Sequence, residues 1–198
     1  MRYTTPDEVT PISTDHAVRK YHGPVASGYD AKRQQSPKWR AENELFRQEL
    51  QDLDARSTVL DVPIGTGRFM ELYDEFDLHP TGVDVSRDML AEAAKKTSGH
   101  AQLQIGDVRE LNFDGRSFDA AVMCRLTRWL SPEDRTIALG ELQRVAKKRI
   151  LFTARVANHP HAYSYEAIDK ALVGWSIVRN HQIGDDDDYR LIVLEPSE

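Results

Sequence analysis

From residue 57 onward, short apolar runs alternate with amphipathic stretches. Five runs rich in Val, Ile and Leu have the length of buried strands. They cover residues 57–62, 80–85, 101–105, 118–123 and 149–153. Helical patterns at 68–76, 86–96 and 132–146 lie between them, while the link from the third run to the fourth is too short for more than a turn or two. Buried strands separated by helices predict a parallel sheet that is covered on both faces.

The end of the chain departs from this alternation. A helix is expected at 163–172, and two strands follow at 173–182 and 189–195, joined by Ile183-Gly184 and the four aspartates 185–188. Because parallel strands need about a dozen linking residues or more, this short link predicts a hairpin. We therefore predict an α/β fold: a doubly wound, seven-stranded, mostly parallel sheet with an antiparallel strand at the C-terminus.

The first 56 residues have a different organisation. Residues 1–14 are polar, contain two prolines and lack apolar periodicity, so a flexible tail is predicted. Residues 15–56 mix basic and aromatic side chains, with breaks at glycines and prolines, and a helix is expected at 38–53 after Ser36-Pro37. We interpret 15–56 as a helical lid on a domain formed by 57–198, although a basic segment that merely packs on the sheet fits the pattern equally well.

Composition excludes several classes of protein. The chain has 198 residues, 40% of them hydrophobic, which suits one domain with a real core. A net charge of −6 argues against a protein that coats nucleic acid. The single cysteine, Cys124, excludes an internal disulfide framework. No apolar run approaches the ~20 residues of a membrane span, and the N-terminus lacks the apolar stretch of a signal peptide, so we expect a cytoplasmic protein without a membrane partner.

The first apolar run ends in a glycine turn, Asp61-Val-Pro-Ile-Gly65-Thr-Gly67. Glycines let the backbone bend tightly and approach a ligand, and in doubly wound sheets ligands bind at the carboxyl ends of the strands. A nicotinamide-type fingerprint would require glycine at position 70, where Met70 stands. In addition, Asp61 would repel a diphosphate but suit a cationic ligand.

The next two strand ends also carry acids. Asp84 lies 23 positions after Asp61 and is suited to accept hydrogen bonds from two ribose hydroxyls. Asp107 follows the third run, where it could accept from an adenine amino group. Each aspartate alone could be a helix N-cap, but three at successive strand ends, beside a glycine turn, indicate a nucleoside site.

Taken together, residues 59–68, 82–90, 106–108 and 118–122 resemble the class I S-adenosylmethionine-dependent methyltransferases. The resemblance covers about Thr58 to Thr153, and the antiparallel last strand of that family agrees with the predicted hairpin. The chain departs from the family where Pro63 replaces a glycine two residues after the first acid.

The resemblance implies S-adenosyl-L-methionine as the cofactor. Asp61 and the glycine turn would border its amino acid end, Asp84 would hold the ribose, and the residues after the fourth strand would face the sulfonium. Two of these residues fit a purely structural role equally well: Met89 as part of a helix core and Cys124 as a small buried apolar residue. The predicted cofactor-binding residues are Asp61, Pro63, Gly65, Gly67, Asp84, Val85, Met89, Asp107, Val108 and Cys124.

Methyl transfer mainly requires alignment and exclusion of water, and it needs a general base only when the acceptor is protonated. The candidate bases are His159, His161 and Tyr163 after the fifth run, and Tyr29 or Asp30 in the N-terminal segment. The two histidines lack a third ligand at a fixed spacing, so no metal site is predicted. The predicted acceptor-binding residues are Tyr21, Trp39, Arg125 and Arg128, and the two arginines suggest an acidic acceptor.

The predicted function is methyl transfer from S-adenosylmethionine to a small molecule. One alternative keeps the cofactor but cleaves or cyclises it without an acceptor. Another is a nucleic-acid methyltransferase guided by the basic segment 19–40, or a binding module without activity. The chain lacks an Asn/Asp-Pro-Pro-aromatic signature and its four aspartates would repel phosphate, which argues against nucleic acid.

Overall fold

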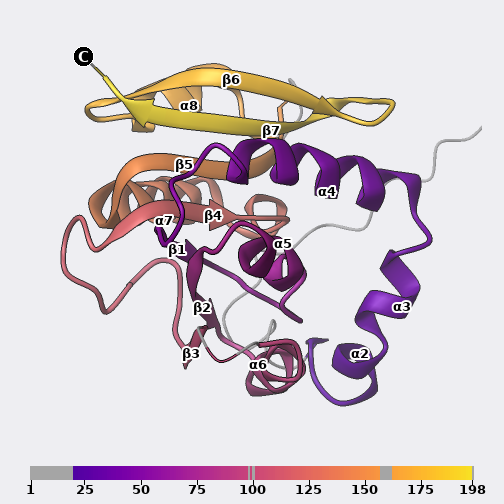
Figure 1. Ribbon diagram of the computed structural model, residues 1–198. Coiled ribbons are helices and arrows are strands. Elements are labelled where there is room, and N and C mark those ends of the chain that lie inside the picture. Colours follow the sequence, from indigo (N-terminus) through magenta and orange to yellow (C-terminus); the bar gives the residue numbers. More distant parts are fainter. Residues whose placement is uncertain (1–19, 98, 100, 157–161, 198) are drawn as a thin grey trace, which may run out of the picture.

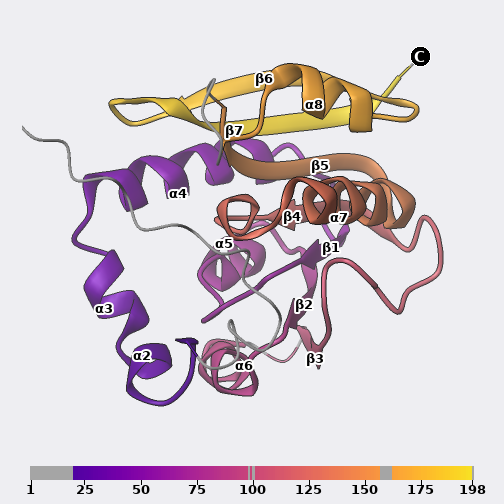
Figure 2. The same ribbon diagram turned by 180° about the vertical axis from the view of Figure 1, so that it is seen from behind.

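The alternation of apolar and amphipathic stretches builds one sheet with helices on both faces (Figures 1 and 2). The computed structural model describes residues 20–97, 99, 101–156 and 162–197, so the predicted tail 1–14 and residues 15–19 of the predicted lid lie outside it. Within this range the sheet has seven strands in the spatial order β3-β2-β1-β4-β5-β7-β6. Their bounds are β1 Thr58–Asp61, β2 His79–Asp84, β3 Gln102–Ile105, β4 Phe118–Met123, β5 Ala146–Arg155, β6 Trp175–Ile183 and β7 Asp186–Pro196.

Strand pairing confirms the predicted topology. The β1 strand pairs in parallel with β2 and β4, and parallel pairing continues from β2 to β3 and from β4 to β5. The last strand, β7, is antiparallel to both of its neighbours, β5 and β6. The chain order reverses between β1 and β4, and in sheets of this kind a ligand crevice opens at the carboxyl ends of such a pair.

The β1 strand divides its side chains between two cores. Val59 packs in the core formed with α4 (Pro37–Leu50) and α5 (Met70–Glu75), whereas Leu60 packs in the core formed with α7 (Pro132–Val145). The remaining helical elements that follow strands are α6 (Arg87–Ala94), a 3-10 helix (Thr127–Trp129) and α8 (Tyr165–Ala171). This alternation is the reason that the apolar runs are continuous: both faces of the sheet are covered.

The acidic tract before β7 was expected to be a loop, and that prediction is wrong. Only Gly184 and Asp185 form the turn, with Gly184 at φ 63°, and residues 186–188 already belong to β7. Asp186 forms ion pairs with Lys38 and Arg155. Its charge is therefore compensated at the start of the strand, while the next two aspartates are exposed to solvent.

Buried acids fix α4 across one face of the sheet. Glu42 and Glu49 are seven residues apart and so lie on the same side of the helix, next to Phe46 and Leu50, which are fully buried. Burial of such apolar side chains contributes about 1.5–3 kcal/mol each. Glu49 binds Arg179 of β6, with an Oε2–Nη2 distance of 2.8 Å. A prediction from apolar periodicity locates this helix but not its charged contacts.

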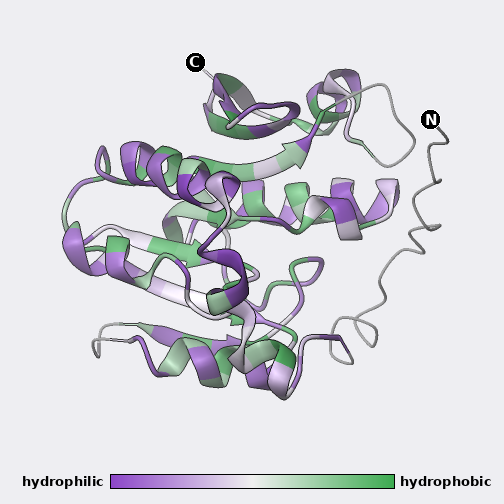
Figure 3. Ribbon diagram, turned by 90° about the vertical axis from the view of Figure 1, so that its right-hand side faces the viewer, coloured by the Kyte–Doolittle hydropathy of each residue, from purple (hydrophilic) through white to green (hydrophobic). Residues whose placement is uncertain are grey.

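Two short helices precede α4. They are α2 (Pro24–Ser27) and α3 (Tyr29–Arg33), and they run from α4 toward α6 at one end of the sheet (Figures 1 and 2). In Figure 3, which faces this end, the helices carry long hydrophilic stretches while the strands between them are largely hydrophobic. No helix among the described residues is long and apolar enough to cross a membrane.

Candidate active site

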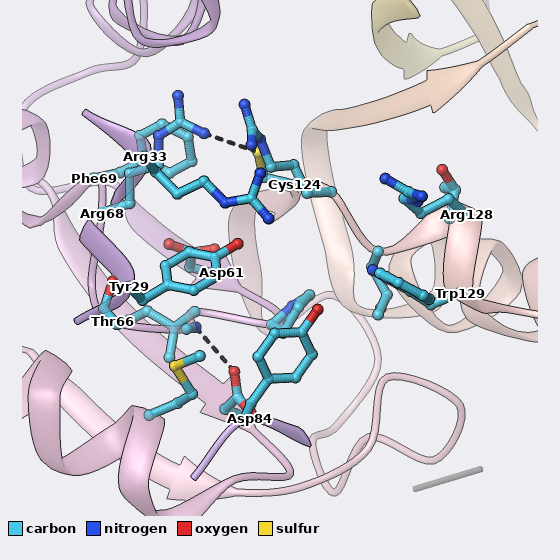
Figure 4. A pocket seen from close by; sticks show the side chains of 18 of the residues that line it. Tyr29, Arg33, Asp61, Thr66, Arg68, Phe69, Asp84, Cys124, Arg128 and Trp129 are labelled. Carbon is cyan, nitrogen blue, oxygen red and sulfur yellow. Dashed lines mark hydrogen bonds between the residues drawn. The ribbon is translucent and has the colours of Figure 1, made fainter. Parts of the chain in front are cut away.

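A cavity of about 320 Å³ opens where β1, β2 and β4 end (Figure 4). Residues 20–39, here called the roof, cover it, and a pocket of about 70 Å³ adjoins it near β3. The two spaces share wall residues from the strand ends and the roof, among them Tyr21, Asp84 and Val85. They therefore form one continuous site at the carboxyl ends of the strands.

The glycine turn has the conformation that its sequence predicts. Gly65 and Gly67 have φ values of 56° and 70°, in the left-handed region that favours glycine. A Cβ on Gly67 would lie 3.1 Å from the Cα of Ala93 in α6. The Gly65 N–H donates to Asp84 Oδ2 over 2.9 Å, and the Val62–Pro63 peptide bond is cis.

Two buried carboxylates face this turn. Asp61 accepts a hydrogen bond from the Tyr73 hydroxyl at 2.9 Å, and burial raises the pKa of Asp61 to about 7. Asp84 accepts from the N–H groups of Gly65 and Ser86, and burial raises its pKa to about 6. Neither carboxylate has an ion-pair partner among the described residues. A cation or a set of hydroxyl donors would stabilise their charged forms.

Asp107, the third acid, has a different environment. It is half-buried and binds Arg109 through both oxygens, with Nε–Oδ1 and Nη2–Oδ2 distances of 3.0 Å and 2.6 Å. It lines the smaller pocket together with Val85 and Val108. Its Oδ1 also accepts from the Arg109 backbone N–H at 3.0 Å, so Arg109 engages both carboxylate oxygens beside this pocket.

Aromatic rings line the roof side of the cavity. The ring centroids of Tyr21 and Tyr29 lie 6.1 Å apart, and those of Tyr29 and Trp39 lie 6.4 Å apart. Burial raises the pKa of Tyr21 to about 12, so its hydroxyl stays protonated at neutral pH. These rings provide flat, apolar contact surface with polar tips.

Hydrogen bonds connect the roof to the segments that follow β1 and β2. Asp30 accepts from the Thr66 hydroxyl at 2.6 Å, within the glycine turn. The Gly23 N–H donates to Asp88 at 2.7 Å, and the Ser86 hydroxyl donates to the Tyr21 carbonyl. The roof thus contacts the loop after β1 and the loop after β2.

A buried charge network lies next to the roof. Glu42 is fully buried, binds the guanidinium groups of Arg68 and Arg125, and accepts from the Tyr189 hydroxyl at 2.6 Å. The Arg68 guanidinium lies 3.5 Å from the centre of the Trp39 ring. Arg125 has φ 61°, an uncommon conformation for a residue with a side chain and one that clusters at functional sites.

The structure places most of the predicted residues around the cavity. Gly67 shapes the turn without lining it, Asp107 and Val108 line only the smaller pocket, and His159 and His161 lie outside the described residues. Burial raises the pKa of the Cys124 thiol, which therefore stays protonated. The predicted residues that line the larger cavity are Tyr21, Tyr29, Trp39, Asp61, Pro63, Gly65, Asp84, Val85, Met89, Cys124, Arg125 and Arg128.

Sequence reasoning missed much of the cation-rich wall. Arg33, Arg68 and Tyr189 line the cavity, and Glu42 supports it from behind. The one available signal was Glu42 itself, an acid on the apolar side of a predicted helix. Among the described residues, no group of three or more His, Cys, Asp or Glu side chains is arranged to hold a metal ion.

Residues 59–149 match the family model of a methyltransferase domain. The chain is 31% identical over 145 residues to malonyl-acyl-carrier-protein O-methyltransferase of Salmonella typhimurium, covering 64% of this chain and 57% of the relative. It is 34% identical over 95 residues to phosphatidylethanolamine N-methyltransferase of Cereibacter sphaeroides, covering 46% and 45%. The chain spans about half the length of the curated relatives that it matches.

Solved structures share the fold at low identity. Magnesium protoporphyrin IX methyltransferase of Synechocystis PCC 6803, solved with bound S-adenosylmethionine, superposes with a TM-score of 0.77 at 14% identity, covering 98% of this chain and 100% of that one. The (4+2)-cyclase SpnF gives a TM-score of 0.65 at 17% identity, with coverage of 80% and 82%. A shared fold of this kind does not by itself select a reaction.

Proposed function

The chain belongs to the class I S-adenosylmethionine-dependent methyltransferase family, and on that premise we propose that it transfers a methyl group from S-adenosyl-L-methionine to a small-molecule acceptor. The observation that carries the proposal is the pair of buried carboxylates, Asp61 and Asp84, beside the glycine turn. The cavity continues from them to an aromatic wall under the roof. One space is thus available for the donor and, next to it, one for an acceptor.

The residues of the site fit the cofactor. Asp84 offers oxygens to ribose hydroxyls at the end of β2, and Asp61 offers negative charge where the amino acid end with its ammonium would lie. The smaller pocket between Val85 and Val108 presents apolar surface and the Asp107 carboxylate, which suits adenine and its amino group. When bound, the cofactor supplies an electrophilic methyl group on a sulfonium.

The remaining tasks fall to side chains of this chain. Trp39 and Tyr29 cover the cavity and would exclude water while aligning the acceptor. Of the candidate bases among the described residues, Tyr29 lines the cavity whereas Asp30 and Tyr163 do not. Tyr29 would therefore accept the proton of a hydroxyl or protonated-amine acceptor. His159 and His161 remain candidates from the sequence.

Calorimetry with S-adenosylhomocysteine tests cofactor binding. We expect micromolar affinity, and we expect Asp84→Ala to weaken it by roughly 1–3 kcal/mol because charged hydrogen bonds are lost. Asp52→Ala, a change of an exposed aspartate far from the cavity, is the matched control. A wild-type chain that does not bind this nucleoside would refute the proposal.

Turnover is tested with the methyl-labelled cofactor and a small-molecule extract. Transfer of label to a low-molecular-weight product is the expected result. Release of methylthioadenosine in the absence of any extract would instead identify the reaction as cleavage of the cofactor.

A further inference from the structure

The cavity wall concentrates positive charge in a protein whose net charge is −6. Apart from the two buried aspartates, every charged side chain that lines it among the described residues is cationic. The side chains are Arg33, Lys38, Arg68, Arg125, Arg128 and Arg155. The acceptor would enter this half of the cavity, so its charge has to suit these groups.

Four of the six cations share two carboxylates. Arg68 and Arg125 both form ion pairs with the buried carboxylate of Glu42. Lys38 and Arg155 both bind Asp186 at the start of β7. These pairs neutralise part of the wall and leave it positive.

Arg33 and Arg128 make no ion pair with any described residue. The Arg33 guanidinium lies 5.3 Å from the centre of the Tyr29 ring, and the Arg128 guanidinium lies 4.7 Å from that of Trp129. Aromatic faces restrain an arginine without neutralising it. Figure 4 shows the two side chains on opposite sides of the cavity, one from the roof and one from the segment after β4.

Exposure separates the two arginines from the donor end of the cavity. Arg33 and Arg128 are exposed, whereas Asp61 is 2% exposed and Cys124 is half-buried. A group bound by the two arginines would therefore lie at the mouth. The methylated atom would lie deeper, at another position of the same molecule.

We propose that the acceptor is an anionic small molecule whose carboxylate or phosphate is held at the mouth of the cavity between Arg33 and Arg128. This inference rests on the proposed methyl transfer. The aromatic roof would contact the flat or apolar body of the acceptor. The anionic group is a binding handle and not the nucleophile, because two guanidinium groups would lower the reactivity of an oxyanion. The sequence suggested Arg125 and Arg128 for this role, but Arg125 is ion-paired with Glu42, whereas Arg33 makes no ion pair with a described residue.

The test is a screen of matched small molecules against the full chain saturated with S-adenosylhomocysteine. Each aromatic or aliphatic body is presented as its carboxylate, its phosphate and its neutral amide, and binding is followed by ligand-observed NMR. We expect the carboxylates or the phosphates to bind and the amides not to bind; whichever of the two binds identifies the anion. Affinity should fall as salt is added.

The double variant Arg33→Gln/Arg128→Gln should lose at least tenfold in affinity for the anions while it keeps its affinity for S-adenosylhomocysteine, which also shows that it folds. Arg40→Gln/Arg87→Gln removes the same charge from exposed positions outside the cavity and should bind as the wild type does. Amides that bind as well as the anions, anions that bind the double variant unchanged, or a panel without any anionic binder would each overturn the proposal. The affinity for S-adenosylhomocysteine is measured first in every sample. A protein that does not bind this nucleoside contradicts the proposed function, whereas one that binds it but shows no preference for anions contradicts only the present proposal.

Discussion

The raised pKa of Asp61 makes nucleoside binding depend on pH. Burial holds the pKa of this carboxyl at about 7, compared with an ordinary value of 3.8. At pH 5 the group is therefore largely protonated and neutral. An ammonium group beside it favours the ionised form, so the affinity for a ligand that carries an amino acid end should rise as the pH increases.

The size of the effect follows from linkage. Below the pKa that Asp61 has without a ligand, each pH unit lowers the ionised fraction of this carboxyl by up to about a factor of ten. If the bound ligand brings the pKa of Asp61 below 5, affinity should increase roughly 30-fold between pH 5 and pH 7. The range stops at pH 7 because an α-amino group itself titrates near ~8.

Calorimetric titration of S-adenosylhomocysteine across this range is the assay. Asp61→Asn keeps an acceptor for the Tyr73 hydroxyl but cannot ionise, so its affinity should change much less with pH. Adenosine, which lacks the amino acid end, serves as the ligand control and reports the share due to Asp84, whose pKa of about 6 also lies in the range. Equal pH profiles of the wild type and the asparagine variant would refute the reasoning.

The same shift has a consequence for stability, with a definite sign. The carboxyl of Asp61 has a higher pKa in the folded state than in the unfolded state, so its contribution to stability is greatest below about pH 4 and is lost as the pH rises toward 7. In urea unfolding, Asp61→Asn should therefore gain in stability relative to the wild type as the pH increases over that range.

Two further substitutions test the framework around the cavity. Glu42→Gln should lower the free energy of unfolding by about 3–5 kcal/mol in urea titrations, because it leaves Arg68 and Arg125 without their buried counter-charge. The control, Glu44→Gln on the exposed side of the same helix, should change this free energy by less than ~0.5 kcal/mol. Similar effects of the two substitutions would argue against the network. Gly67→Ala should cost more than ~1 kcal/mol and weaken nucleoside binding, because φ is 70° and the new methyl group would meet Ala93 at 3.1 Å. Its control, Gly140→Ala in α7, adds a methyl group with no neighbour within 4 Å and should raise the free energy of unfolding by about 0.5–1 kcal/mol. If Gly67→Ala left both the stability and the nucleoside affinity unchanged, the turn would tolerate a side chain.

The sheet was predictable because its signals are local. Each strand is a short apolar run and each acid stands at the end of one, so periodicity and spacing predicted the order of the elements and the positions of Asp61 and Asp84. The helices α2 and α3 have four and five residues, too short for an apolar period to be recognised between the glycines. The sequence therefore predicted only that this segment is a helical lid interrupted at glycines and prolines, without the bounds of its two short helices.

The cation-rich wall of the cavity was not predictable to the same extent. Its contacts join residues far apart in the sequence, such as Glu42 with Tyr189 and Lys38 with Asp186. Nothing near Arg125 in the sequence indicates that it pairs with Glu42, and nothing near Arg33 indicates that it faces the same cavity. The tract of aspartates shows the same limit: its composition suggested a loop, whereas the partners of Asp186 come from α4 and β5.

The two halves of the cavity have different origins along the chain. The three acids expected to face the nucleoside, Asp61, Asp84 and Asp107, come from one continuous stretch, from β1 to the loop after β3. Of the cation-rich wall, Arg68 comes from the same stretch, whereas Arg33, Arg125 and Tyr189 come from segments before and after it. Under the proposed function, exchanging the flanking segments between relatives should therefore change the acceptor side of the cavity while it keeps the three acids in place.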